Sequence, residues 1–316
     1  MRDTVLAADL GGTNLRIAAV DGEGNVVHRS RVSTPASKSR EDIAVCIGDL
    51  ALQCVEALGP ESRPAAFCVT APAIISAKDG TIFSSPNLPD LNGFDLAGVL
   101  EQRLGLPVVL ENDANAAAVG ESWKGASKGA DNSICVTLGT GVGGGLIIDG
   151  RLVRGADGTA GEVGHITVEP NGYECGCGNF GCVEQYSSAT AITHITALLK
   201  ADFPQSSLAN VEHPSPVEVF DAGKNGDPLA LEVFRQVGTY LGVALAGLVN
   251  VLNPEVIVIG GGVSASWDLF IEYTREQIKK RAFRQPGERV KLVRAALGDD
   301  AGTLGAAKLA FEKYKA

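Results

Sequence analysis

A strand that runs into a glycine-rich turn and a second strand occurs twice in this sequence, 128 residues apart. The first copy spans Val5 to Gly22 around the turn Leu10-Gly11-Gly12-Thr13-Asn14, and the second spans Ile134 to Gly150 around Gly139-Thr140-Gly141. Short apolar runs bounded by glycine are typical of β-hairpins. The repeat predicts two related domains that each open with a hairpin, with chance resemblance between two glycine-rich hairpins as the alternative.

The rest of the chain alternates between strand and helix patterns, which predicts the α/β class. Strands are expected at 66–69, 108–110 and 256–259, and helices at 40–58, 114–123, 189–199, 216–222, 229–252 and 303–315. A loop rich in glycine and cysteine, Gly155 to Gly181, follows the second hairpin. No low-complexity linker separates the halves, so we expect two lobes packed around a cleft.

Charge and hydropathy exclude several classes of partner. The 27 Lys and Arg residues against 37 Asp and Glu residues leave a net charge of −10 with no basic run, which argues against nucleic acid and anionic membrane. The longest apolar run, Leu241 to Leu252, is shorter than the roughly 20 residues of a membrane helix and predicts a core helix instead. Met1-Arg2-Asp3-Thr4 lacks the basic start of a signal peptide, so no export is expected.

The glycine clusters are candidate nucleotide sites. Gly139 to Gly144 matches Gly-x-Gly-x-x-Gly, but a Rossmann turn leads into a helix and a strand follows here, so we reject that interpretation. Glycine turns can still present backbone N–H groups to phosphate oxygens. A third cluster, Gly260 to Gly262, would let a nucleoside lie against backbone. Each cluster alone is more often a tight turn, but together they favour a phosphate-binding protein.

Two carboxylates lie at the ends of predicted strands. Asp9 adjoins the first glycine turn, where it could hold the hydrated Mg²⁺ of a nucleoside triphosphate or simply end the strand. Asp113 follows a strand and precedes an alanine-rich helix, so it could cap that helix. It could equally accept a hydroxyl proton as a nucleophile forms, and these residues alone leave both interpretations open.

His165, Cys175, Cys177 and Cys182 lie within 18 residues and form a Cys₃His set suited to tetrahedral zinc. Three cysteines cannot pair off among themselves, and the remaining four are scattered in apolar segments as reduced thiols would be. Four protein ligands leave no open position, so this metal should order the loop rather than activate water. Glu162 and Glu184 flank the segment, either as site residues or as solvated loop charges.

In combination these motifs resemble the ROK family of sugar kinases and related repressors. The motifs that carry the resemblance cover essentially the whole chain: Asp9 to Arg16, Glu111 to Ala116, Leu138 to Gly145, Gly161 to His165, Cys175 to Glu184, Gly260 to Val263 and Ala301 to Ala307. The resemblance implies an α/β, two-lobed, actin-like ATPase fold of the sugar kinase and Hsp70 superfamily, with two related RNase H-like domains around a cleft. It implies a small domain of residues 1–115 plus 301–316, a larger one of residues 116–300 with the zinc loop, and a homodimer.

The resemblance also implies roles for individual residues. ATP phosphates would be held by Asp9, Gly11, Gly12, Thr13, Gly139, Thr140 and Gly141, with Gly260, Gly261 and Gly262 near the adenosine. Asp113 would be the catalytic base. Sugar hydroxyls would contact Asn87, Asn112, Asp113, Glu162, His165 and Glu184. His165 would give one ring nitrogen to zinc and the other to the sugar, so zinc loss should damage catalysis indirectly.

The implied reaction is phosphoryl transfer from MgATP to the 6-hydroxyl of an aldohexose, with lobe closure excluding water. Glucose is the first choice, which implies a glucokinase of glycolysis. ATP use, free thiols and the lack of a targeting segment predict a cytoplasmic location. Ala71-Pro72-Ala73 and Asn87 to Gly93 depart from the family pattern near the expected sugar pocket, which leaves fructose, mannose, N-acetylmannosamine and N-acetylglucosamine as alternatives.

Two functions without catalysis remain as further alternatives. A sugar-responsive repressor of this family carries a helix-turn-helix ahead of the first hairpin, whereas the hairpin here starts at Val5, so DNA binding by such a module is not expected. A sugar sensor would keep the pocket and could lose the base, but Asp113 and both phosphate turns are present.

Overall fold

A computed structural model describes residues 4–59 and 62–315, which form two compact units. Residues 1–3, on which the expectation of no export signal partly rests, lie outside the described residues. The first unit comprises Met1–Asp131, Gly145–Gly161 and Ala296–Ala316, and the second comprises Asn132–Gly144 and Glu162–Ala295. Each unit mixes strands and helices, which confirms the α/β class.

The expected boundary after residue 115 differs from this division. Helix α3 (Asp113–Lys124) belongs to the first unit because it packs along α10 (Ala301–Lys315). A Cβ at Gly120 or Gly305 would collide with the backbone of the other helix, so small residues allow this close approach.

The first unit contains a five-stranded sheet in the order β3-β2-β1-β4-β7. Its strands are β1 (Thr4–Leu10), β2 (Asn14–Asp21), β3 (Val26–Ser33), β4 (Phe67–Ala71) and β7 (Val108–Asn112). β1, β2 and β3 are antiparallel neighbours, whereas β4 is parallel to β1 and to β7. The register pairs Asp9 with Thr70, and Ala71 with Asn112, so the carboxyl ends of the three parallel strands share one edge. Ligands of open α/β sheets bind at such an edge.

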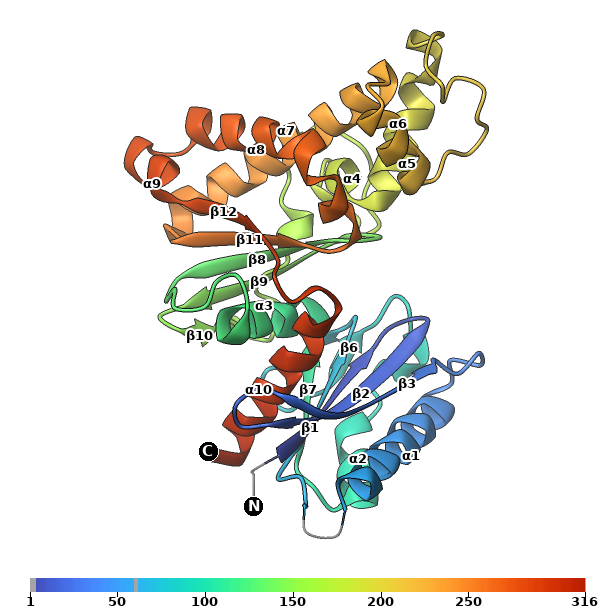
Figure 1. Cartoon of the computed structure of the whole chain (residues 1–316), viewed down its shortest axis with the longest axis vertical. Helices are drawn as coiled ribbons and strands as arrows, with labels where there is room; N and C mark the ends of the chain where they lie inside the picture. The colour runs from blue at the N-terminus through green and yellow to red at the C-terminus, as the bar shows by residue number, and fades with distance from the viewer. Residues whose placement is uncertain (1–3, 60–61, 316) are drawn as a thin grey trace. The chain divides into compact units, whose positions relative to one another are not determined.

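Helices cover both faces of this sheet (Figure 1). α1 (Arg40–Leu58) and α2 (Leu96–Leu104) pack on one face, where Leu6, Ala8 and Leu10 join the core, and α10 packs on β1 and β4. Because both faces are buried, residues 5–8 in the middle of β1 are all apolar and do not alternate with polar residues. The predicted helix 40–58 is confirmed, and its start is set by Ser39, whose side chain accepts a hydrogen bond from the Asp42 N–H. A small hairpin of β5 (Ile74–Ile75) and β6 (Ile82–Ser84) completes the unit.

The second sheet has the order β10-β9-β8-β11-β12, which repeats the order of the first. Its strands are β8 (Ser133–Leu138), β9 (Val142–Ile148), β10 (Arg151–Leu152), β11 (Val256–Gly260) and β12 (Lys291–Arg294). As in the first sheet, the outer pair, β9 and β10, is antiparallel. β11 is parallel to both of its neighbours, β8 and β12. The internal repeat predicted from the two hairpins is therefore confirmed.

Helices pack above the second sheet in Figure 1. They are α4 (Glu184–Ser187), α5 (Ala189–Leu199), α6 (Pro216–Lys224), α7 (Pro228–Leu252), α8 (Trp267–Arg281) and α9 (Arg284–Arg289). Among the described helices, α7 alone is long and apolar enough to cross a membrane by length and composition, but 61% of its apolar window is buried in the fold. It packs along α8, which confirms the predicted core helix.

Candidate functional site

The first glycine turn is held by hydrogen bonds to its backbone. The Gly11 N–H donates to the Asn14 carbonyl at 2.8 Å, and the Thr34 hydroxyl donates to the Gly11 carbonyl at 2.7 Å. The Thr34 N–H donates to the Thr13 carbonyl at 2.9 Å, and Thr13 itself is exposed. Because these carbonyl oxygens are already hydrogen-bonded, the turn has a fixed conformation before any ligand arrives. A preformed turn of this kind suits an anion that accepts from backbone N–H groups.

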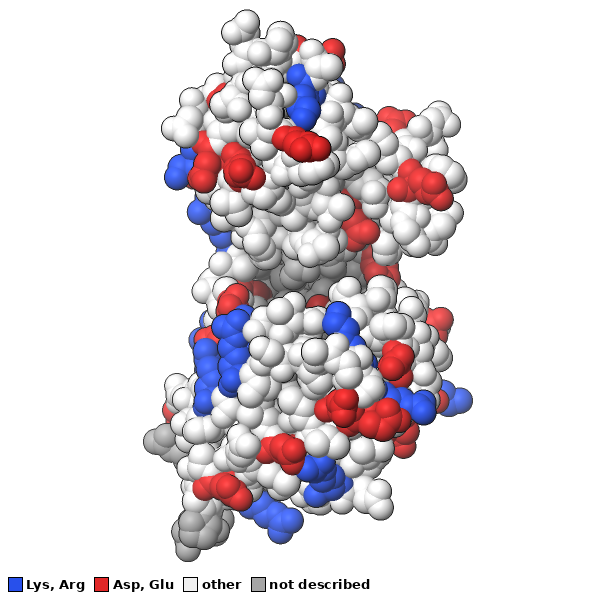
Figure 2. Space-filling model, turned by 90° about the vertical axis from the view of Figure 1, so that its right-hand side faces the viewer, with Lys and Arg blue, Asp and Glu red and all other residues white. Residues whose placement is uncertain are grey.

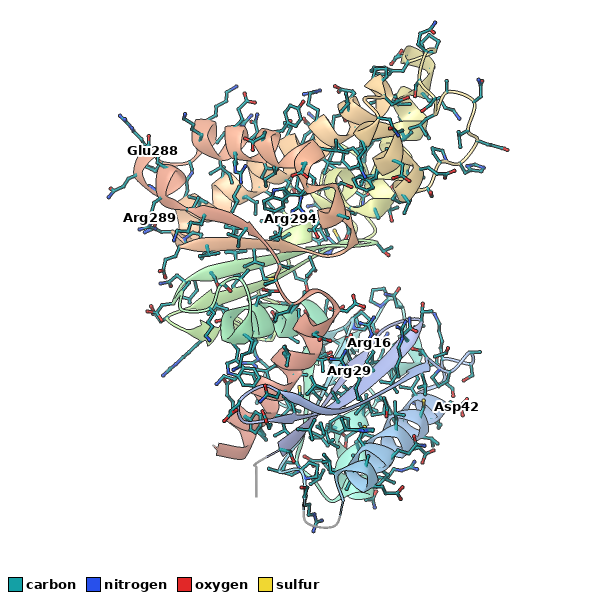
Figure 3. The ribbon with its side chains drawn as sticks, viewed as in Figure 1. Arg16, Arg29, Asp42, Glu288, Arg289 and Arg294 are labelled. Atoms are coloured by element: carbon teal, nitrogen blue, oxygen red, sulfur yellow. The ribbon has the colours of Figure 1, made fainter. Side chains whose placement is uncertain are left out.

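Asp9 lies at the end of β1, directly before this turn. Its carboxylate is 3.5 Å from Arg16 Nη1 and accepts a hydrogen bond from the Thr70 hydroxyl at 3.3 Å. Arg16 extends from β2, near Arg29 of β3 in Figure 3, and also pairs with Asp299 at 2.7 Å. Burial raises the pKa of Asp9 above its ordinary range, although Arg16 and Thr70 oppose that shift. A bound cation would favour the ionised form of Asp9. The arrangement therefore fits a carboxylate that is ionised when a metal-bound phosphate is present.

The second glycine turn is anchored in the same way within its own unit. The Ala189 N–H donates to the Gly139 carbonyl, and the Thr190 hydroxyl donates to the Thr140 carbonyl, both at 2.8 Å. In each unit, therefore, a threonine hydroxyl holds a carbonyl of the glycine turn, Thr34 in the first and Thr190 in the second. Thr140, like Thr13, is exposed at its turn. The resemblance between the hairpins extends to the bonds that shape them.

In the third glycine cluster, Gly260 to Gly262, backbone packing requires glycine at one position. Gly261 has a φ of +81°, and a Cβ there would collide with the backbone of Leu138. The Ser264 hydroxyl donates to its carbonyl at 2.7 Å as a 3₁₀ helix, Gly262–Ser266, begins. Close packing on β8 thus accounts for Gly261, and contact with a nucleoside stays a prediction.

The strand-to-helix turn at Asn112 and Asp113 resolves one of the open interpretations. The Asn112 side chain caps α3 by accepting from the Asn115 N–H at 3.0 Å, and its amide donates to the Ala73 carbonyl at 3.1 Å. Asp113 is the first residue of the helix, and its Oδ1 accepts from the Ala114 N–H at 2.9 Å. The suggestion that Asp113 is the helix cap is therefore wrong, because Asn112 has that role. A carboxylate at the carboxyl end of a parallel strand is well placed to act on a ligand there.

Two segments that depart from the family pattern adjoin Asn112 and the first glycine turn. Asn112 bonds to Ala73, and the neighbouring Pro72 carbonyl accepts from the Ser85 hydroxyl at 3.0 Å. The loop that follows Ser85 carries exposed Asn87, and a Cβ at Gly12 would be in ordinary contact, at 3.7 Å, with that of Asn87. In the first unit, the hydrogen bonds from Asn112 to Ala73 and from Ser85 to Pro72 therefore connect the segment that carries Asn112 to the segment that carries Asn87.

An ion pair between the buried carboxylate of Glu111 and the partly exposed guanidinium of Arg154 was not anticipated from the sequence. Glu111, 5% exposed, binds Nε and Nη2 of Arg154 at 2.7 Å through one carboxylate oxygen. Its other oxygen accepts from the Asn112 N–H and from Asn115 Nδ2, both at 3.0 Å. The signal was a charged residue that continues an apolar strand, because a buried carboxylate requires a partner.

The four predicted metal ligands come together in the second unit. The ligand atoms of His165, Cys175, Cys177 and Cys182 lie within 4.8 Å of one another. Cys177 Sγ is 3.7 Å from Cys182 Sγ, and Cys175 Sγ is 3.6 Å from His165 Nδ1. Tetrahedral zinc with bonds of about 2.3 Å to sulfur and about 2.0 Å to nitrogen requires separations of roughly 3.8 Å and 3.5 Å. The donor set and its spacing fit zinc.

Neighbouring groups orient these ligands. Gln185 Nε2 donates to Cys175 Sγ at 3.6 Å. Burial, together with the adjacent sulfur atoms, raises the pKa of the Cys182 thiol to about 12. His165 Nδ1 faces Cys175, whereas its Nε2 lies 4.0 Å from the Glu162 carboxylate. The two ring nitrogens therefore face different groups, as a histidine shared between a metal and a substrate requires.

Glu184 begins helix α4 and adjoins both the metal ligands and the second glycine turn. One carboxylate oxygen accepts from the Val142 N–H at 2.9 Å, and the other lies 4.0 Å from Cys175 Sγ. The interpretation of Glu184 as a solvated loop charge is wrong, because its carboxylate has these defined partners.

The predicted site residues divide between the two units. The first unit holds Asp9, Gly11, Gly12, Thr13, Asn87, Asn112 and Asp113. The second holds Gly139, Thr140, Gly141, Glu162, His165, Cys175, Cys177, Cys182, Glu184, Gly260, Gly261 and Gly262. On the face shown in Figure 2, acidic and basic side chains are interspersed over each unit.

Comparison with known proteins extends this description. The chain is 35% identical to a glucokinase of Thermotoga maritima, over 98% of both chains. It is 32% identical to a xylose repressor of Caldicellulosiruptor bescii, over 96% of this chain and 76% of the repressor. Its structure resembles that of a ROK family glucokinase from Streptomyces griseus in complex with glucose and AMPPNP, with a TM-score of 0.80, 35% identity and coverage of 98% and 99%.

Two related sheets, each opening with a glycine-turned hairpin, together with the match to these solved structures, define an actin-like ATPase fold. The sequence pattern of the ROK family matches residues 5–313. The chain belongs to the ROK family, as its motifs predicted.

Proposed function

We propose that this protein is a hexose kinase that transfers the terminal phosphoryl group of ATP to the 6-hydroxyl of glucose. The observation that carries the proposal is the position of Asp113, which directly follows parallel strand β7 and begins α3, while Asn112 beside it caps the helix. Similarity to glucokinases over almost the whole chain supports glucose as the substrate. Phosphoryl transfer depends mainly on positioning and charge stabilisation, which preformed turns and fixed carboxylates supply.

In this proposal the Asp113 carboxylate accepts the proton of the sugar hydroxyl as that oxygen attacks phosphorus. Asn87, Asn112, Glu162, His165 and Glu184 bind the other sugar hydroxyls. The N–H groups of Gly12 and Thr13 in the first turn and of Thr140 and Gly141 in the second hold the phosphates, while those of Gly11 and Gly139 donate within their own turns. Gly260 to Gly262 lies against the adenosine. Mg²⁺ bound with ATP would neutralise phosphate charge, and Asp9 is the carboxylate placed to hold its water ligands.

We also propose that His165, Cys175, Cys177 and Cys182 bind a structural zinc ion. Such a metal would fix the loop between Glu162 and Glu184, and thereby the direction of His165 Nε2. Support comes from the four donor atoms within 4.8 Å of one another. The resemblance further suggests a homodimer and a role in glycolysis. ATP use and free thiols support a cytoplasmic location, and the net charge of −10 without a basic run argues against nucleic-acid and anionic-membrane partners.

A sugar-responsive repressor is the second candidate, because the chain is 32% identical to a xylose repressor. Such a protein binds a sugar without turning over ATP. The presence of Asp113 and of both anchored phosphate turns favours the kinase. A sensor that keeps the sugar pocket alone would share the repressor's lack of turnover.

The test is sugar-dependent ADP release by zinc-replete protein with MgATP. The sugars are glucose, mannose, fructose, N-acetylglucosamine and N-acetylmannosamine. We expect the highest kcat/KM with glucose. Preference for another hexose would change the assigned substrate but leave the kinase activity in place. Sugar binding without turnover of any hexose would contradict the kinase proposal.

A further inference from the structure

A charged network lies below the turn that carries Asp113, wholly within the first unit. Glu111 is 5% exposed and Asn115 is 2% exposed. Each oxygen of the Glu111 carboxylate is used, one by Arg154 and the other by the Asn112 N–H and Asn115 Nδ2. Arg154 comes from a distant part of the chain and fixes the carboxylate through two nitrogens at 2.7 Å.

The network costs more free energy than apolar side chains would in the same place. The loss of hydration of a buried carboxylate can exceed what its ion pair gains, and here that loss falls on Glu111, because the Arg154 side chain is 35% exposed. Asn115 adds a second cost, because its Oδ1 is buried without a hydrogen-bond partner among the described residues. Costs of this kind concentrate where geometry matters to function. The network therefore calls for a reason beyond stability.

Its hydrogen bonds set the direction of the residues that follow Glu111. The carboxylate fixes the peptide N–H of Asn112, and Asn112 in turn caps α3 and bonds to Ala73. Asn115, one turn into the helix, is tied to the same carboxylate oxygen. Asp113 lies between these two anchored residues, so its backbone has no freedom to rotate independently of them.

We propose that Glu111 and Arg154 are positioning residues for the base Asp113. This inference rests on the proposed kinase activity. A displacement of about 1 Å at a reacting group can lower a rate roughly 100-fold. The pair acts on Asp113 through the peptide of Asn112 and touches neither substrate, so its loss should reduce turnover more than ligand binding.

The test compares Glu111→Gln and Arg154→Lys with the wild-type protein. Gln keeps an acceptor for the two N–H donors but loses the charge, and Lys keeps the charge but loses the planar fork of two donors. At a temperature where every variant is folded, we expect kcat with glucose to fall about 10- to 100-fold in Glu111→Gln and less in Arg154→Lys. The dissociation constant of glucose, measured by calorimetry, should change less than threefold.

Asp227→Asn is the matched control. Asp227 is a carboxylate of the second unit, 8% exposed, that accepts from Ser206, Ser207, Leu229 and Ala230. This variant should lower the thermal midpoint without a selective loss of kcat. If both test variants keep kcat within twofold of the wild type, or lose it no more than Asp227→Asn, the positioning role is overturned while the kinase stands. If the wild type phosphorylates no hexose in the same assay, the kinase proposal fails and this inference fails with it.

Discussion

The carboxylate of Glu184 accepts a hydrogen bond from the backbone N–H of Val142 at 2.9 Å, while its other oxygen lies 4.0 Å from the sulfur of Cys175. One side chain thus adjoins the second glycine turn and the metal-ligand cluster. Glycine at position 141 leaves room for this contact, because a Cβ there would collide with the Glu184 carboxylate and push it aside. The glycine motif and the cysteine motif, separate in the sequence, are joined by this residue.

Gly141→Ala should therefore disturb the fold of the ligand-free protein. The new Cβ must displace the end of the Glu184 side chain and break its hydrogen bond to the Val142 N–H, so we expect a loss of about 0.5–1.5 kcal/mol in unfolding free energy. Gly139→Ala is the matched variant, since a Cβ there has open space within 4 Å. Thermal unfolding without nucleotide measures both, and equal midpoints for the two variants would contradict the collision.

Removal of the metal should weaken substrate binding. Cys177→Ser removes one of the four donors, and the loop that orients His165 Nε2 and Glu184 then loses its anchor. We expect less than one zinc per chain by metal analysis, a lower thermal midpoint, and a KM for glucose raised about tenfold.

Cys46→Ser is the control for that experiment. Cys46 is a free thiol of α1 and does not belong to the cluster of His165, Cys175, Cys177 and Cys182. Its zinc content and KM should equal those of the wild type. Full zinc occupancy in Cys177→Ser would remove Cys177 from the ligand set.

Asp113→Asn should separate catalysis from binding. The amide keeps the size and the acceptor that bonds to the Ala114 N–H but cannot take a proton. Loss of a general base typically lowers a rate about 10²- to 10⁴-fold, so we expect kcat to fall in that range. Calorimetry should give an unchanged glucose affinity, and near-normal turnover would show that another group accepts the proton.

Asp9→Asn should have opposite effects on stability and on nucleotide binding. Burial raises the pKa of Asp9, so the folded chain holds a proton there more tightly than the unfolded chain does. The ionised carboxylate therefore costs stability. This cost grows from about pH 4, where the unfolded group loses its proton, up to the raised pKa of the folded group, and is constant above it. At neutral pH the ligand-free variant should melt at the same temperature as the wild type or higher.

MgATP supplies the other half of that test. The Asn variant cannot provide a negative charge for the metal that accompanies the phosphates, so its nucleotide affinity should fall about tenfold or more. Unfolding scans with and without MgATP measure both effects. A variant that melts lower without ligand and is stabilised normally by MgATP would contradict the assignment of Asp9.

Local patterns predicted the elements whose apolar residues are unmistakable. The helices 40–58 and 189–199 occur at the expected bounds, and the strands at 66–69 and 108–110 are present in slightly shifted or longer forms. No element was assigned to β3, α8 or β12. Each has polar or charged residues along a partly exposed surface, so contact with neighbouring elements defines it more than periodicity does.

The candidate site divides in the same way. Motifs predicted the glycine turns, the candidate metal ligands and the candidate base Asp113, because each requires a particular residue type at short spacing. Glu111 and Arg154 were missed because they are 43 residues apart and meet only when the segment after β10 folds against β7. Glu184 was noticed as a charge beside the cysteines, but its bond to Val142 spans 42 residues.

By itself, the sequence determined the α/β class, the repeated hairpin, the family and the residue types of the candidate site, because backbone freedom, hydropathy period and ligand chemistry act over short stretches of chain. Only the tertiary structure decided that Asn112 and not Asp113 caps α3, that α3 belongs with α10, and that Glu184 and Glu111 have the partners described above. These outcomes depend on which distant groups satisfy a buried carboxylate or amide. A buried carboxylate or amide requires a hydrogen-bond partner, and the tertiary structure determines which distant group lies close enough to be that partner.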